Sequence, residues 1–136
     1  MELFTKAMTE MDAAVDLETN RIAVRIPRGA VLLKASVYMP QEVAASLIEK
    51  GISDYEKAYD IQKDHLADMG EHPRGELLFG LADAYSRLGN TAKAQVYFQR
   101  VTADMKGTVY ASRAAKWLET KSLTKAESGC VGCHIK

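Results

Sequence analysis

The stretch between Leu77 and Val101 constrains the fold of this chain more than any other. It reads LLFGLADAYSRLGNTAKAQVYFQRV, and its apolar residues recur at helical spacing on both sides of Gly89. Ala82 and Ala94 would let two antiparallel helices approach closely, because small side chains leave room between the backbones. We therefore expect a helical hairpin that turns at Gly89, with the space around the alanines filled by Leu78, Leu81, Tyr85 and Phe98.

This spacing resembles the tetratricopeptide repeat (TPR), in which large, small and aromatic residues alternate over two helices. Four positions depart from the family pattern: Leu78 replaces tryptophan, Thr91 an aromatic residue, Val101 an alanine and Lys106 a proline. One repeat cannot bury both of its faces, so neighbouring helices must flank it. The resemblance implies an all-α fold of TPR-like antiparallel hairpins, with residues 47–66 and 109–118 as degenerate partners.

The rest of the chain predicts further helices and one extended piece. Apolar periodicity predicts helices at about 2–17, 29–38, 41–69, 75–88, 91–105 and 108–121. Ile22, Val24 and Ile26 alternate before Pro27, which favours an extended connector at 21–27. Residues 1–121 would form one helical domain, closed by Trp117 as a core residue. The polar stretch that begins at residue 122 would be a flexible tether, giving a second region at 122–136.

Two groups of charged residues are expected to face solvent. Arg21, Arg25 and Arg28 form a local basic cluster, which is most simply a solvated face and otherwise a docking site for haem propionates or an acidic partner. Asp54 falls on the charged side of the predicted helix 41–69, with several lysines and glutamates.

The chain ends in a Cys-x-x-Cys-His pattern formed by Cys130, Cys133 and His134. This is the pattern of covalent c-type haem attachment. Its resemblance to c-type cytochromes implies one haem c, with both cysteines as thioether anchors and His134 as the proximal axial ligand. Other uses of the cysteines remain open. A zinc site would have to recruit His65 or His72, and a reactive or inert dithiol is the further alternative.

A haem held at this tail needs a second axial ligand or an open position. Only two other histidines exist, so His65 or His72 is the expected distal ligand. Met69 comes next, and His65 and Met69, four residues apart, would share a helix face. An open distal position would instead allow small gases to bind.

Composition excludes several classes of function. Eighteen basic residues balance eighteen acidic ones, so no overall field favours nucleic acid. No apolar run is long enough to span a membrane. The sequence also lacks the basic start and apolar run of a signal peptide. Since the cytochrome resemblance implies haem attachment outside the bacterial cytoplasm, we expect a periplasmic or extracellular protein whose signal or anchor was removed.

The resemblance to c-type cytochromes implies a monohaem electron-transfer protein. We do not expect an enzyme, because no pair of carboxylates is arranged for acid–base catalysis. A redox partner protein would dock on the helical body, and a homo-oligomer with haem at its interface is possible. Two alternatives remain. The first is a TPR interaction adaptor with a C-terminal metal or dithiol site, and the second is a haem-based gas sensor.

Overall fold

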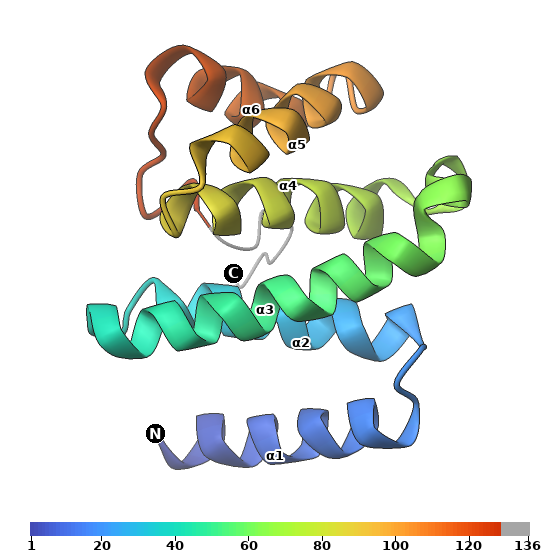
Figure 1. Ribbon diagram of the computed structural model, residues 1–136, viewed down its shortest axis with the longest axis vertical. Helices are drawn as coiled ribbons and strands as arrows, with labels where there is room; N and C mark the ends of the chain where they lie inside the picture. Colours follow the sequence, from blue (N-terminus) through green and yellow to red (C-terminus); the bar gives the residue numbers. More distant parts are fainter. Residues whose placement is uncertain (129–136) are drawn as a thin grey trace.

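The computed structural model describes residues 1–128, and within them every regular element is helical (Figure 1). The elements in chain order are α1 (Glu2–Leu17), α2 (Ile22–Ser36), α3 (Gln41–Gln62), the 3-10 helix η1 (Lys63–Asp68), α4 (Glu71–Arg87), α5 (Thr91–Asp104) and α6 (Val109–Thr120). Helices α2 and α3 form one hairpin and α4 and α5 a second, α6 packs against α5, and α1 lies against α2. This arrangement confirms the predicted all-α fold class. None of these helices combines the length and apolar character needed to cross a bilayer.

The hairpin α4–α5 has the packing that its sequence predicts. Ala82, Ala94 and Phe98 are fully buried, and Gly89 turns the chain with a φ of 82°. Trp117 of α6 closes the core, since its ring stacks on Phe98 with centroids 4.5 Å apart. The prediction that Trp117 is a core residue is therefore confirmed.

Helices α5 and α6 each begin with a side-chain cap. The Asn90 side chain accepts a hydrogen bond from the backbone N–H of Lys93, and the Thr108 hydroxyl accepts one from Ala111. Each cap pairs a backbone N–H that has no partner inside the helix. The local sequence thus sets the starts of α5 and α6.

The predicted extended connector at 21–27 is wrong, because α2 begins at Ile22 and continues through Pro27. Pro27 is the sixth residue of the helix, so its missing N–H removes one hydrogen bond, to the carbonyl of Ala23. Ile22 and Ile26 are also four residues apart, and both pack against the core on one helix face. The packing of α2 therefore overrides the local preference of proline.

The boundaries around residue 70 also differ from the prediction. The α-helical part of the expected helix 41–69 ends at Gln62, and η1 follows with a non-helical backbone at His65. Helix α4 begins at Glu71, which puts Pro73 in its first turn. A proline there costs no hydrogen bond, because the first N–H groups of a helix have no intrahelical partner.

The arginines of α2 are not a solvated face. Arg28 is buried and binds both carboxylate oxygens of Asp54 at 2.7 Å, and Arg25 donates to the same carboxylate at 2.9 Å. Asp54 is fully buried, so its expected exposure on α3 is also wrong. A carboxylate can be buried at this position because two guanidinium groups satisfy it. The hydrogen bonds to Asp54 raise the pKa of Arg28.

Tyr55, next to Asp54, joins three helices. A Cβ at Gly29 of α2 would lie 2.6 Å from its ring, and a Cβ at Gly80 of α4 would lie 2.2 Å from it. The ring is therefore held between two glycines, where no larger residue fits. Its hydroxyl donates to Glu76 of α4 at 3.0 Å, and burial raises the pKa of Tyr55 well above its usual value.

Candidate functional site

The candidate site is the groove between α2 and α4, the first helices of the two hairpins. Residues 22–31 of α2 face residues 72–76 of α4, whereas Ser36 and Val37 lie near Arg87. The two helices therefore run in the same direction. At their N-terminal ends a cavity of about 530 Å³ opens between them, with mainly apolar walls formed by Ile22, Ala23, Ile26, Pro27, Ala30, Val31, His72, Pro73 and Glu76.

Helix α4 presents a line of polar side chains along this groove. His72, Glu76, Asp83 and Arg87 are spaced four, seven and four residues apart, which places them on one helix face. Glu76 and Asp83 are buried. A buried carboxylate needs hydrogen-bond partners, and the Tyr55 hydroxyl is one partner of Glu76.

Arg87 fixes the C-terminal end of the groove. It donates to the carbonyl oxygen of Leu33 at 3.1 Å and to the hydroxyl of Ser36 at 2.6 Å, which ties α4 to α2. Burial lowers the pKa of this guanidinium.

The segment after α6 returns to the groove and binds there. The Ser128 hydroxyl donates to the carboxylate of Asp83, with 2.8 Å to each oxygen, and both residues are buried. Lys116 of α6 donates to both carboxylate oxygens of Glu127, at 2.8 and 2.7 Å. These contacts correct the prediction of a flexible tether for residues 122–128.

Glu127 also organises the turn of this segment. Its carboxylate accepts a hydrogen bond from the backbone N–H of Thr124 at 2.9 Å, and its own carbonyl accepts one from Arg113 at 3.3 Å. The hydrogen bonds from Lys116 and then Thr124 lower the pKa of Glu127 to about 2. The segment is therefore held through an ionised carboxylate at neutral pH.

Among the predicted distal ligands, His72 lies at the cavity. Its Nδ1 is 3.0 Å from the hydroxyl oxygen of Tyr110 of α6. The same hydroxyl lies 3.4 Å from the backbone carbonyl oxygen of His72, to which it can donate. Burial, followed by the charges of Glu76 and Glu71, raises the pKa of Tyr110 to about 12, so this phenol keeps its proton.

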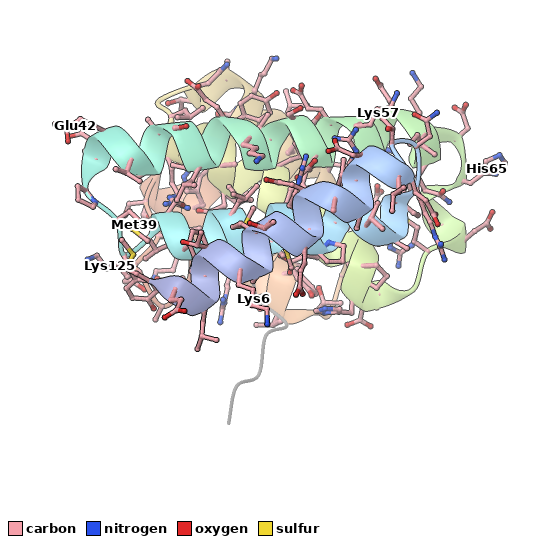
Figure 2. The ribbon with its side chains drawn as sticks, turned by 90° about the horizontal axis from the view of Figure 1, so that it is seen from below. Lys6, Met39, Glu42, Lys57, His65 and Lys125 are labelled. Atoms are coloured by element: carbon pink, nitrogen blue, oxygen red, sulfur yellow. The ribbon has the colours of Figure 1, made fainter. Side chains whose placement is uncertain are left out.

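The other two candidates lie elsewhere. His65 points outward at the edge of the molecule, with 70% of its side chain exposed and its Nδ1 3.5 Å from Asp68 (Figure 2). Met69 follows the end of η1 in extended backbone and packs against the core. The prediction that His65 and Met69 share a helix face is wrong, because the helix breaks at His65.

The predicted attachment residues Cys130, Cys133 and His134 lie outside the described residues. Within residues 1–128, no three histidine, cysteine, aspartate or glutamate side chains gather into a group that could hold a metal ion.

Sequence reasoning missed Tyr110, Glu76 and Asp83. The two carboxylates could have been noticed as acidic residues within the apolar run of α4, since a charge at a buried position needs a partner. Tyr110 gave no such signal, because it meets His72 only when α6 packs beside α4.

Comparison with known proteins agrees with this architecture. Residues 75–103 match the family model of the tetratricopeptide repeat, a range that covers most of α4 and α5. The chain has no significant match among curated proteins or solved structures. The repeat match and the helical hairpins together show a TPR-like all-α fold. They also support a role in protein–protein interaction, for which stacked TPR helices provide extended surfaces.

Proposed function

We propose that this chain is a monohaem c-type cytochrome-like protein that transfers single electrons, with a TPR-like body that houses the haem and docks a redox partner. The observation that carries the proposal is the binding of Ser128 to Asp83 inside the groove. Cys130 follows only two residues later, within about 7 Å of extended chain. In the sequence, the Cys-x-x-Cys-His motif therefore directly follows a segment that is bound in the groove between α2 and α4.

The residues of the groove fit such a group. The apolar side chains of α2 would cover a porphyrin face and keep water away from it. A haem needs such a cover, because its large apolar faces would promote aggregation if they were exposed. When bound, haem would supply an iron that cycles between two oxidation states. Cys130 and Cys133 would hold it covalently, and His134 would bind the iron on the proximal side.

The TPR-like body supports the second half of the proposal. Its surface would orient a redox partner protein close to the groove, and a second copy of the chain could cover a haem edge in a homo-oligomer. Covalent haem attachment in c-type cytochromes implies a periplasmic or extracellular location. We propose no bond-making reaction for this site.

The TPR match favours one second candidate, an interaction adaptor. In that case Cys130, Cys133 and His134 would form an accessory metal or dithiol site, and the groove would bind protein alone.

One experiment tests the proposal. The chain is produced in cells that contain the haem attachment machinery, together with a Cys130→Ala/Cys133→Ala control and a known c-type cytochrome. We expect the denatured protein to keep a covalent haem mass and a sharp reduced α-band, and the control to be colourless. A colourless chain beside a coloured reference cytochrome would contradict the proposal, and bound zinc found by elemental analysis would favour the adaptor.

A further inference from the structure

We propose that His72, positioned by Tyr110, is the second axial ligand of the haem iron, and that the cavity between α2 and α4 is the haem pocket. This inference rests on the proposed function.

The position of His72 separates it from the other candidates. Of the two histidines within residues 1–128, His72 lines the apolar cavity, whereas the side chain of His65 is largely exposed. A porphyrin between α2 and α4 would meet apolar side chains of α2 and the imidazole of α4. Met69 packs against the core and does not line this cavity.

Tyr110 gives His72 the tautomer that an iron ligand needs. The phenol can donate its single proton to the carbonyl oxygen of His72, so its oxygen then accepts from the ring at Nδ1. A proton on Nδ1 leaves the lone pair of a neutral imidazole on Nε2. Metal-bound histidines commonly donate their second ring N–H in this way, which fixes the orientation of the ring.

The position of Tyr110 is fixed by packing. Its side chain is buried, and a Cβ at Gly75 would lie 2.5 Å from its ring. The ring also lies near Phe79, with centroids 6.3 Å apart. Gly75, one turn after His72 on α4, therefore lets the phenol reach the imidazole.

The length of the tail is sufficient. Asp83, where Ser128 binds, is eleven residues after His72 on the same face of α4, or about 16 Å along the helix. His134 comes six positions after Ser128, and this stretch spans up to about 20 Å when extended. The motif can reach the cavity while Ser128 stays bound to Asp83.

The test compares His72→Ala with the matched control His65→Ala in the matured, full-length protein. Haem content is first measured as the mass of the denatured, unmodified protein. If this protein carried no covalent haem, the proposed function would fail, whichever residue were the second axial ligand. We expect the unmodified protein and His65→Ala to be low-spin and to resist carbon monoxide. His72→Ala should become high-spin and bind carbon monoxide. If His72→Ala stayed low-spin, or His65→Ala alone became high-spin, the inference would be overturned.

Tyr110→Phe tests the positioning role, because it keeps the ring and removes the acceptor. We expect an unchanged melting temperature and haem content, with carbon monoxide displacing the ligand about 10–100-fold more readily. In the Cys130→Ala/Cys133→Ala chain, which needs no haem, nitrogen NMR should find the proton of His72 on Nδ1, and this preference should weaken in Tyr110→Phe. An unchanged tautomer in that variant would contradict the role of Tyr110.

If His72→Ala failed to fold, as judged by circular dichroism, His72→Met would keep a side chain able to bind iron. We expect it to stay low-spin with a raised reduction potential, because thioether ligation favours the reduced iron. A potential equal to that of the unmodified protein would contradict ligation by residue 72.

Discussion

The two hairpins of this protein share one apolar core but differ in what is buried between their own helices. The hairpin α4–α5 packs through a continuous apolar core in which Phe98 is fully buried between Phe79 and Trp117. The hairpin α2–α3 also buries apolar residues, but it encloses a charged group as well, since Asp54 is buried and bound by Arg25 and Arg28. The first arrangement has the repeat spacing that the family model matches, whereas the second lies outside the matched range.

This difference shows why only one hairpin matches the repeat family. Apolar packing at fixed spacing leaves a recognisable pattern in the sequence. A buried ion pair needs only two or three residues, and in sequence they look like ordinary surface charges. The α2–α3 pair can therefore have TPR-like geometry without TPR-like sequence.

The largest effect should come from the apolar hairpin. Phe98→Ala should lower the free energy of unfolding by about 3–5 kcal/mol, because it opens a cavity beneath Trp117. Val96→Ala, on the exposed side of the same helix, is the matched control and should change little. Urea unfolding followed by circular dichroism measures both, and equal effects would refute an apolar core centred on Phe98.

The charged hairpin should respond to the loss of one partner. Arg28→Ala should cost about 3 kcal/mol, because it removes the two-oxygen contact to buried Asp54. Arg21→Ala is the control, since Arg21 pairs with Glu18 at the surface and should contribute less than about 1 kcal/mol.

The pairing also predicts non-additivity. Arg28→Met combined with Asp54→Leu should cost less than the sum of the single changes, because no unpaired charge is left inside. Strictly additive free energies would mean that the two side chains do not stabilise each other.

The contact between the two hairpins should be sensitive to a single methyl group. Gly80→Ala places a Cβ 2.2 Å from the Tyr55 ring, so we expect a loss of about 1–3 kcal/mol from overpacking. Gly89→Ala tests the cost of backbone strain instead. A Cβ at Gly89 would have open space around it, but the residue has a positive φ, which residues other than glycine rarely adopt. If Tyr55→Leu failed to relieve the Gly80→Ala loss, the clash with the ring would not be its cause.

The smallest effect should be confined to residues 122–128, the segment after α6. Because the folded pKa of Glu127 is about 2, below its ordinary 4.5, its contacts stabilise the binding of this segment above about pH 4.5, and this stabilisation is lost as the pH falls toward 2. Hydrogen exchange of the Thr124 amide, which donates to Glu127, should therefore accelerate in acid beyond its intrinsic pH dependence. Glu127→Gln should remove this transition, and a transition that persisted in the variant would belong to another group.

Much of the fold and part of the site could be predicted from the sequence. The hairpin at Gly89, the burial of Trp117 and the cap at Thr108 follow from local spacing and hydrogen-bonding capacity. The helical state of residues 22–27 could not be predicted in this way, because Pro27 and the alternation of Ile22, Val24 and Ile26 favour extended backbone locally. His72 was one of several candidate ligands, and its place beside a cavity depends on α2, which lies far from it in sequence.

The sequence by itself determined that this chain is helical, where its best hairpin turns, and that it carries a Cys-x-x-Cys-His motif, because these properties depend on neighbouring residues. Only the tertiary structure decided that Asp54 is an interior charge, that Ser128 binds Asp83, and that Tyr110 meets His72. Each of these contacts joins residues more than twenty positions apart, and their meeting depends on how whole helices pack against each other.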